Sequence, residues 1–502
     1  MSTLPSACVI GAGSSGIAAA KALHERGIPF ECFEKSDRVG GNWVFGNRNG
    51  MSSAYRSLHI NTSRERMEYS DFPMPKSYPD FPHHTQIANY FDDYVDHFGF
   101  RDKIVFNTGV EHAARDDAGE WTVTLDTGET RRYDALLVAN GHHWDPRWPE
   151  PPFPGHFDGV QMHSHHYVEN TDFRDKNVLV VGIGNSAMDI AVEASFVARR
   201  TFLSSRRGAY ILPKYLFGRP LDQIGVNALT PLMPFAFRRA ILTAMYRVGV
   251  GKVQDYGLPE PDHKLGEAHP TISADFLNRI AHGEMTWKPN IAALAGDKVS
   301  FADGSVEPVD VIVYCTGYRV TFPFFDEDFI SASDNDLPLF RRVFKPGIDN
   351  VFFIALLQPL GATMPLAEAQ GRWIAAYLRG EYHLPPRAQM EADMRRERER
   401  MFKRYVASTR HTMQVDFDNY LSDLRKELAV GAKRARAAGT RQSWPSPPSA
   451  RSAREDAAAR QRCSEPKRES STTSSRLVDR TNGSTELGFA RETCARRGEG
   501  GV

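Results

Sequence analysis

Two stretches of the sequence repeat the same order of elements: an apolar strand, a glycine-rich turn and a helix. The first stretch is Ala7–Gly16, which continues into the helix-like Ile17–Arg26. The second is Asn177–Ala187, which continues into Met188–Ala198. This order is typical of the βαβ unit that begins a dinucleotide-binding domain. The repeat predicts an α/β fold with two Rossmann-like domains.

A second repeated element marks where each predicted domain closes. Asp134–Gly141 and Asp310–Gly317 align without gaps, and each reads as a buried strand that ends in a turn. We place the second domain at residues 156–325, inserted into a first domain made of 1–155 and 326–437. The returning part contains a predicted strand, Val351–Leu356, and a predicted helix, Leu366–Leu378, which give the first sheet its closing layer.

The end of the chain differs in composition from the rest. Residues 387–430 are charged and predict amphipathic helix. Residues 438–502 are rich in Arg, Ser, Ala, Gly and Glu and poor in large apolar residues. Such a segment buries too little apolar surface to fold, so we predict a disordered tail.

Charge and cysteine content exclude several classes of protein. The 62 basic and 62 acidic residues cancel, which leaves no bulk electrostatic argument for a nucleic-acid partner. The five cysteines include no C-x-x-C pair, which excludes a dithiol redox motif and favours a reducing compartment. We find neither a signal peptide nor an apolar run of about 18 to 20 residues. A cytoplasmic protein without an integral membrane span is expected.

The first glycine turn has the spacing that binds a nucleotide with free ribose hydroxyls. Gly11 makes the tight turn, Gly13 lets the backbone approach a pyrophosphate, and Gly16 lets the helix pack on the strand. The helix N-terminus then offers N–H groups to the phosphates. Glu34, at the end of the second strand, is placed to accept hydrogen bonds from the ribose. The alternative is a purely structural turn.

The second turn differs at one informative position. Counted from Gly182, the equivalent of Glu34 is Ser205, which is followed by Arg206 and Arg207. A carboxylate would repel a 2′-phosphate, whereas a serine and an arginine would bind it. The second site is therefore predicted to take NADPH, with solvated surface charges as the alternative for the arginines.

Two nucleotide sites in one chain indicate that hydride passes from NADPH to a second cofactor. FAD fits the first site, and the turn Gly40–Trp43 fits an extended flavin nucleotide. Since the sequence has no cysteine pair, the electrons go to an external acceptor, for which O2 is the obvious choice.

The segment Phe157–Tyr167 resembles the F-x-G-x-x-x-H-x-x-x-[YF] signature of flavin-containing monooxygenases, and it lies before the second glycine turn as in that family. The resemblance covers roughly residues 5–425. Other stretches that resemble the family are Gly40–Trp43, Asn61–Ser63, Asp71–Pro75, Asn140–His143, Cys315–Tyr318 and Gln358–Gly361.

The resemblance implies a mechanism. NADPH reduces FAD, NADP+ stays bound, and the reduced flavin takes up O2 as a C4a-(hydro)peroxyflavin that a nucleophilic nitrogen or sulfur of a small molecule attacks. The protein mainly excludes water and supplies hydrogen bonds. Asn61 matches the asparagine that contacts flavin, NADP+ and the oxygenating intermediate; read alone, Asn61–Ser63 could also be a turn or a helix cap. The predicted cofactor contacts are Gly11, Gly13, Ser14, Ser15, Gly16, Glu34, Lys35, Gly41, Asn42, Trp43, His59, Asn61, Thr62, Gly182, Gly184, Asn185, Ser186, Ala187, Ser205, Arg206, Thr316, Gly317 and Gln358.

Several alternatives remain open at this stage. A Baeyer–Villiger monooxygenase resembles F-x-G-x-x-x-H-x-x-x-W, and this chain has Tyr167 at the last position. An NADPH oxidase that releases H2O2 would use the same cofactors. His163, His165 and His166 could suggest zinc, but no acid or cysteine completes the set, so we predict no metal. The signature segment is expected to be a linker loop, and His83, His84, His142 and His143 are expected at the surface or in turns. A homodimer is a further expectation, and the aromatic region 208–250 could form a substrate wall or ordinary packing.

Overall fold

The computed structural model describes residues 4–224, 235–330, 332, 335–404 and 412–439. The first sheet is parallel except for its edge strand β23, which runs antiparallel to β24. Its strands, in spatial order, are β23 (Phe344–Lys345), β24 (Ile348–Phe353), β7 (Ala135–Val138), β1 (Ala7–Ile10), β2 (Phe30–Phe33) and β3 (Ile104–Val105). The returning segment therefore joins the first sheet, as the sequence predicted.

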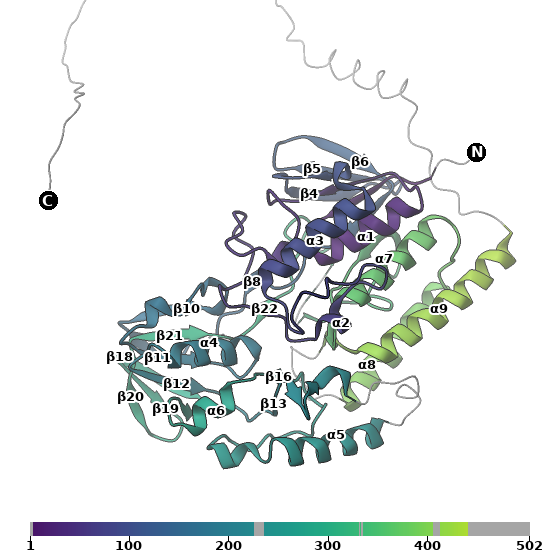
Figure 1. Ribbon diagram of the computed structural model, residues 1–502. Helices are drawn as coiled ribbons and strands as arrows, with labels where there is room; N and C mark the ends of the chain where they lie inside the picture. The colour runs from purple at the N-terminus through teal and green to yellow at the C-terminus, as the bar shows by residue number, and fades with distance from the viewer. Residues whose placement is uncertain (1–3, 225–234, 331, 333–334, 405–411, 440–502) are drawn as a thin grey trace, which may run out of the picture. The chain divides into compact units, whose positions relative to one another are not determined.

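Helices cover one face of the first sheet and a small antiparallel sheet covers the other. α1 (Ser14–Glu25) packs on α3 (His84–Phe98) and on α7 (Met364–Leu378), and Figure 1 shows the three side by side. On the opposite face, Cys8 and Leu136 share a core with Trp121. That face is covered by β4 (Val110–Arg115), β5 (Trp121–Leu125) and β6 (Thr130–Tyr133).

The second sheet is wholly parallel and has the order β10, β21, β11, β12, β17. Alternate residues of β11 point to its two faces: Val178 packs with α4, while Leu179 packs with Phe202 and the strand β18. The elements are β10 (Val160–His163), β21 (Val311–Tyr314), β11 (Asn177–Val181), β12 (Arg200–Ser204), β17 (Thr286–Lys288), α4 (Asn185–Ser195), α6 (Phe276–Ala281), and the covering sheet β20 (Val306–Pro308), β19 (Lys298–Phe301), β18 (Ile291–Gly296) and β9 (Gly155–Phe157).

The two repeated stretches of the sequence make equivalent hydrogen bonds in the structure. The Gly11 amide donates to the carbonyl of Phe33 at 2.8 Å, and the Gly182 amide donates to Ser204 at 2.9 Å. Each closing strand also follows an aspartate that ties it to the start of its own sheet. Asp134 Oδ2 accepts from the Ser6 amide at 2.7 Å, and Asp310 Oδ2 accepts from the Asn177 amide at 2.6 Å. The prediction of two Rossmann-like folds is confirmed.

Further elements lie in the chain between the strands and helices named so far. They are α2 (Arg64–Met67), η1 (Gly41–Trp43), η2 (Arg101–Lys103), β8 (Asp145–Pro146), η3 (Ser164–His166), η4 (Asn170–Phe173), β13 (Ile211–Leu212), β14 (Tyr215–Leu216), β15 (Arg219–Pro220), η5 (Leu221–Gln223), α5 (Phe235–Gly249), η7 (Val253–Tyr256), β16 (Thr271–Ile272) and β22 (Tyr318–Arg319).

One local prediction was wrong. The segment Phe157–Tyr167 is not a loop, because β9 and β10 within it are strands of the second half of the fold and Ser164–His166 forms a 3-10 helix. The run 387–430 was predicted to be partly amphipathic helix, and its helical character is confirmed. It divides into α8 (Arg387–Arg404), β26 (Gln414–Asp416) and α9 (Phe417–Ala438), and β26 pairs in parallel with β25 (Gln358–Leu360). The predicted disordered tail lies outside the described residues beyond position 439.

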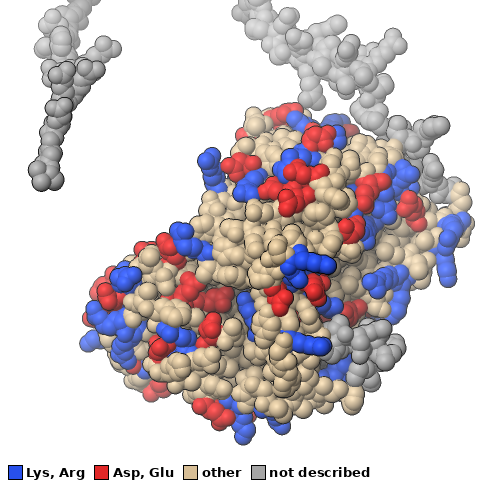
Figure 2. Space-filling model, viewed as in Figure 1, with Lys and Arg blue, Asp and Glu red and all other residues tan. Residues whose placement is uncertain are grey.

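The surface view in Figure 2 shows lysine and arginine interspersed with aspartate and glutamate over the described part of this face. Many charged side chains of the described residues are paired, as Arg131 is with Glu129 at 2.8 Å and Arg38 is with Asp92 at 2.6 Å. Within the ranges given above, no helix is both long and apolar enough to cross a membrane.

Candidate functional site

The first glycine turn has no room for a side chain at Gly11 or at Gly16. A Cβ placed on Gly11 would lie 2.8 Å from the carbonyl oxygen of Ala139, and one on Gly16 would lie 1.8 Å from the carbonyl oxygen of Gly11. Gly11 also has a φ of +98°, which L side chains rarely adopt. α1 begins at Ser14, directly after the N-cap Gly13, and no side chain caps it. Its first amides, including that of Ser15, are thus available to an anion.

A second turn comes back against the first one. The Gly40 amide donates to the carbonyl of Ala12 at 3.0 Å, and a Cβ on Gly41 would lie 3.1 Å from the Cα of Gly13. Asn42 fixes the outer end of this turn, because its Oδ1 accepts from the Ser53 amide at 2.8 Å. Trp43, the last residue of the turn, packs against the core of the first sheet. Two bare backbone turns in contact form a cradle that suits a pyrophosphate.

Glu34 stands beside this cradle with both carboxylate oxygens oriented. Oε2 accepts from the Ala12 amide at 2.7 Å, and Oε1 accepts from the Ser36 amide at 2.8 Å. Burial raises the pKa of Glu34, while the two amide bonds act in the opposite direction. Each oxygen keeps a lone pair for a ribose hydroxyl. The neighbouring Lys35 is exposed.

The second glycine turn repeats the geometry of the first. Gly182 has a φ of +136°, and a Cβ there would lie 2.6 Å from the carbonyl oxygen of Cys315. α4 follows with Gly184 as its N-cap and no side-chain cap. Asn185 Oδ1 accepts from the Ile272 amide at 2.8 Å and so tethers the helix start. Of the next two predicted contacts, Ser186 is half-buried and Ala187 is buried in the core below α4.

The structure separates the roles of the three residues after β12. Ser205 is buried, and its hydroxyl donates to the carbonyl of Arg207 at 3.0 Å while accepting from Trp287 Nε1 at 2.9 Å. Arg207 Nε lies 3.2 Å from a carboxylate oxygen of Asp262. Arg206 is exposed, and no carboxylate of the described residues comes within 4.0 Å of it. Of the two adjacent arginines, Arg206 is therefore the one without an acidic partner among the described residues.

The predicted contacts at the closing strands are held by the backbone of other segments. Thr316 Oγ1 donates to the carbonyl of Arg147 at 2.5 Å, and the Arg147 amide donates to the carbonyl of Gly317 at 2.9 Å. The Gln358 amide donates to the carbonyl of Met413 at 2.8 Å, at the start of the two-stranded β25–β26 pair. The C-terminal segment that holds Gln358 was not foreseen from the sequence.

Asn61 lies in a loop between the cradle residues and α2. Its Oδ1 is buried and has no hydrogen-bond partner among the described residues. Thr62 beside it is half-buried. His59 is exposed, with Nδ1 at 2.7 Å from the carbonyl oxygen of Ser57, and partial desolvation of its ring lowers its pKa. An unpartnered buried amide oxygen is costly, so this position suits a water or a bound group that donates a hydrogen bond.

The histidines pack rather than gather around a metal. His163 is fully buried, and its Nδ1 accepts from the His165 amide at 3.1 Å. Burial lowers the pKa of His163 to about 4. Across the described ranges, no group of three or more metal-ligating side chains converges. His84, expected at the surface, is instead buried, because the N-terminus of α3 places it against the loop of Arg56.

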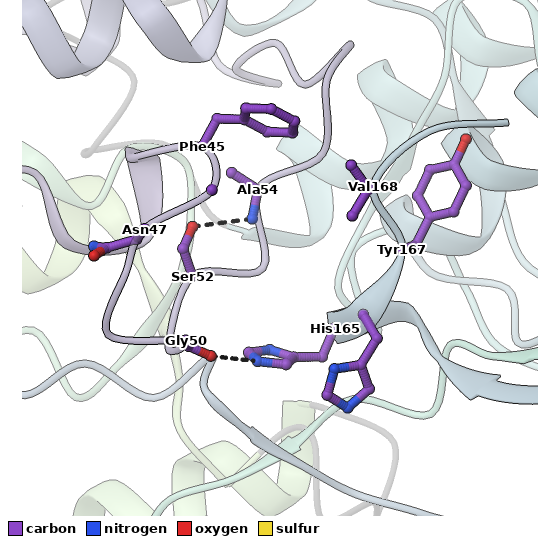
Figure 3. A pocket seen from close by; sticks show the side chains of 10 residues that line it. Phe45, Asn47, Gly50, Ser52, Ala54, His165, Tyr167 and Val168 are labelled. Carbon is purple, nitrogen blue, oxygen red and sulfur yellow. Dashed lines mark hydrogen bonds between the residues drawn. The ribbon is translucent and has the colours of Figure 1, made fainter. Parts of the chain in front are cut away.

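Figure 3 shows a cavity of about 240 Å³ between the loop that follows Trp43 and the segment after β10. His165 Nε2 lies 3.2 Å from the carbonyl oxygen of Gly50 across it, and Tyr167 closes one side. Its lining residues, which the sequence did not single out as a group, are Phe45, Gly46, Asn47, Gly50, Ser52, Ala54, His165, His166, Tyr167 and Val168. It is smaller than the roughly 300–1,000 Å³ of most ligand pockets.

Two glycine cradles, one beside Glu34 and the other beside Ser205 and Arg206, have the geometry of a protein that binds two dinucleotides. The family model described as flavin-binding monooxygenase-like matches residues 6–435. The chain is 37% identical over 440 residues to flavin-containing monooxygenase 5 of Rattus norvegicus, covering 84% of this chain and 82% of that one. It is 33% identical over 443 residues to dimethylaniline monooxygenase [N-oxide-forming] 2 of the same organism, covering 85% and 82%.

Solved structures show the same fold. S-allyl-L-cysteine S-oxygenase from Allium sativum has a TM-score of 0.63 at 24% identity, covering 92% of this chain and 99% of that one. An open structure of cyclohexanone monooxygenase has a TM-score of 0.64 at 19% identity, covering 86% and 98%. The chain belongs to the flavin-binding monooxygenase-like family. It is an FAD- and NADPH-dependent monooxygenase.

Proposed function

We propose that this monooxygenase transfers one oxygen atom of O2 to a soft nucleophilic nitrogen or sulfur of a small molecule and releases NADP+ and water. The single observation that carries the proposal is the buried, unpartnered Oδ1 of Asn61 in a chain whose family membership spans residues 6–435. Among its relatives, one is named for N-oxide formation and one structural neighbour for S-oxygenation.

The residues present fit FAD at the first cradle. The pyrophosphate would lie where Gly11, Gly13 and Gly41 leave no side chain, against the first amides of α1. Glu34 would accept the ribose hydroxyls with the lone pairs that Ala12 and Ser36 leave unused. Bound FAD supplies the acceptance of hydride and the activation of O2.

The remaining proposed flavin contacts surround this cradle and the Asn61 loop. Those of the cradle are Ser14, Ser15, Gly16, Lys35, Asn42 and Trp43, and those beyond it are His59, Thr62, Thr316, Gly317 and Gln358.

The residues present also fit NADPH at the second cradle. Gly182 and Gly184 would let the pyrophosphate approach α4, with Asn185, Ser186 and Ala187 in the first turn of the helix. Arg206, which no described carboxylate neutralises, would bind the 2′-phosphate. The hydroxyl of Ser205 already has a donor and an acceptor, so we assign Ser205 to holding Arg207 and Trp287 in place.

The protein's own part in oxygen transfer is orientation and exclusion of water. The Asn61 amide group can donate through Nδ2 and accept through Oδ1, which suits a reacting oxygen that gives and receives hydrogen bonds. No strong acid–base pair is needed, because a soft nucleophile attacks directly. A hydrogen bond offered in a buried site of low dielectric stabilises developing charge more than it would in water.

Tyr167 favours nitrogen or sulfur as the target. It occupies the last position of the signature, where the Baeyer–Villiger pattern has tryptophan. It is buried, stacks on Phe173 with ring centroids 5.4 Å apart, and donates its hydroxyl to Glu193. Conversion of ketones to esters remains the alternative activity, with release of H2O2 as the other.

The test is substitution of Asn61→Ala, with Asn278→Ala on the exposed face of α6 as the control. We expect Asn61→Ala to keep its flavin and to consume NADPH, but to form about 100-fold less oxygenated product, with H2O2 appearing in place of product. The assay measures product, H2O2 and NADPH together for a thioether, a tertiary amine and a ketone. Wild-type protein that yields only H2O2, or oxygenates only the ketone, would contradict the proposal.

Three finer points belong to the proposal as well. We place the domain boundaries at residues 155, 325 and 437, to be tested by limited proteolysis. We propose a homodimer, to be tested by light scattering of the purified protein. We propose a cytoplasmic location, to be tested by fractionation of cells that express the chain.

A further inference from the structure

The loop that carries Asn61 is held at both ends by one segment from the other half of the fold. This segment, residues 211–223, runs from β13 to η5 and lies between β12 and β17 in the chain. Lys214 Nζ donates to the carbonyl of Ile60 at 3.3 Å, directly before Asn61. Asp222 Oδ2 accepts from the amide of Ser63 at 2.7 Å, directly after Thr62.

Two further backbone bonds of the loop come from its own domain. The Ile60 amide donates to the carbonyl of Pro82 at 3.1 Å, and the Arg64 amide donates to the carbonyl of Asp80 at 2.7 Å. These bonds fix the residues outside the pair Asn61–Thr62. The two bonds from residues 211–223 fix the peptide groups that flank this pair, so they determine how far Asn61 can move.

The bond from Asp222 is a strong one. It joins a carboxylate to a backbone amide at 2.7 Å, and hydrogen bonds to an ionised acceptor are about twice as strong as neutral ones. Gln223 adds a second bond to the same residue, from Nε2 to the hydroxyl oxygen of Ser63 at 3.1 Å. Ser63 itself is fully buried. The downstream end of the loop is therefore held firmly.

Lys214 sits in an unusual position for a lysine. Its side chain is half-buried, its ammonium lies 5.0 Å from the ring centroid of Phe81, and no carboxylate of the described residues is within 4.0 Å. Desolvation lowers the pKa of Lys214, and the more distant Asp189 and Asp275 act in the opposite direction. Partial withdrawal of an ammonium from water is costly when one carbonyl bond is its only hydrogen bond to the described residues.

We propose that Lys214 and Asp222 are positioning residues that hold the Asn61 loop in place for oxygen transfer. Without them, Asn61 would spend less time in the productive orientation, and the activated oxygen would be lost as H2O2. This inference rests on the role proposed for Asn61. It also gives part of the aromatic region 208–250 a function: the segment is a support for the reacting site.

The first experiment compares four variants with a control from the same segment. Lys214→Met and Asp222→Ala remove the two bonds, while Lys214→Arg and Asp222→Asn retain a donor and an acceptor. Tyr215→Phe is the control, because it removes only the exposed bond from the Tyr215 hydroxyl to Asp80. Product per NADPH and H2O2 per NADPH are measured with a thioether, together with KM for the thioether and flavin content.

We expect Lys214→Met and Asp222→Ala to lower product per NADPH at least about threefold, with flavin content and KM little changed. Lys214→Arg and Asp222→Asn should recover most of the loss, and Tyr215→Phe should match wild type. Independently of turnover, amide hydrogen exchange in the peptide 60–64 should become about tenfold faster in Asp222→Ala, because the Ser63 amide loses its acceptor.

A double-mutant cycle separates this inference from the proposed function. If Asn61 is the group being positioned, adding Lys214→Met to the Asn61→Ala protein should not lower product per NADPH any further. The inference is overturned if the losses of product per NADPH in the two single variants multiply in the double variant. It is also overturned if Lys214→Met and Asp222→Ala each give as much product per NADPH as wild type. If Asn61→Ala gives as much product per NADPH as wild type, the proposed function is overturned instead. If Asp222→Ala fails to fold, Lys214→Met and Asp222→Asn still decide the question.

Discussion

Arg206 offers the most direct test of how the second cradle selects its nucleotide. Arg206 and Arg207 are adjacent and both exposed, but only Arg207 has a carboxylate partner, Asp262 at 3.2 Å. The two residues therefore form a matched pair in which one cation is free and the other is neutralised. We expect Arg206→Ala to weaken the binding of NADPH and to leave the binding of NADH unchanged.

The size of the effect follows from the exposure of Arg206. A hydrogen bond between charged groups contributes about 1.5 to 3 kcal/mol, and solvent screening places an exposed guanidinium near the lower end. A value of about 1.4 kcal/mol corresponds to a tenfold change in affinity. KM for NADPH should thus rise about tenfold in Arg206→Ala. Arg207→Ala should change it less than about threefold, since its charge is already used.

The assay is initial-rate kinetics with NADPH and with NADH at two ionic strengths. The wild-type preference for NADPH should fall with added salt, and that dependence should be reduced in Arg206→Ala. An equal rise in KM for both nucleotides would mean that Arg206 supports the fold and does not read the 2′-phosphate. An effect of Arg207→Ala as large as that of Arg206→Ala would refute the argument from the Asp262 pair.

Two further predictions concern the first cradle and the buried histidine. Gly11→Ala should lose most of its flavin on purification, since its Cβ would meet the carbonyl oxygen of Ala139 at 2.8 Å; absorbance per protein measures this. Gly27→Ala, with φ of +62° and open space around it, should keep its flavin. His163 has a folded pKa of about 4 against about 6.5 unfolded, so the unfolded chain binds the extra proton between these values. The free energy of unfolding should therefore fall as the pH drops through this window. Between pH 7 and pH 5.5 the fall should be about 1 kcal/mol larger in wild type than in His163→Asn.

Each of these two predictions has an outcome that would contradict it. Equal flavin loss in Gly11→Ala and Gly27→Ala would point to general strain at positive φ rather than to a blocked cradle. For the histidine, urea unfolding at pH 7 and pH 5.5 gives the free energy of unfolding for both proteins. Parallel changes in wild type and His163→Asn would mean that His163 does not remain neutral in the folded protein.

The sequence alone determined the architecture and the cradles, because these depend on local rules. Glycine spacing and the apolar strands fixed the positions of both turns, and counting 23 residues from each first glycine brought Glu34 and Ser205 to equivalent strand ends. Aspartates at 134 and 310 repeat because each one ties the closing strand to its own sheet. Such features need only a few neighbouring residues, so a linear pattern contains them.

Hydrogen bonds and strand pairings between residues far apart in the sequence were decided by the tertiary structure. The sequence predicts that Ser205 and Arg206 bind one phosphate, and only the structure shows that Trp287, 82 positions away, donates to the serine hydroxyl. The sequence predicted a loop for the signature segment Phe157–Tyr167, but Val160–His163 pairs with β21 in the second sheet. A pattern of residue types cannot show which hydrogen bonds are already used by distant groups.

Asn61 shows the same division within a single residue. Its place in an Asn61–Ser63 motif could be read from the sequence, and so could its resemblance to a functional asparagine. Only the structure shows that its Oδ1 is buried without a partner among the described residues. Only the structure shows, too, that Lys214 and Asp222 form hydrogen bonds to the backbone before and after Asn61–Thr62. The sequence determines which side chain is present, but burial and orientation arise when segments some 150 residues apart come into contact.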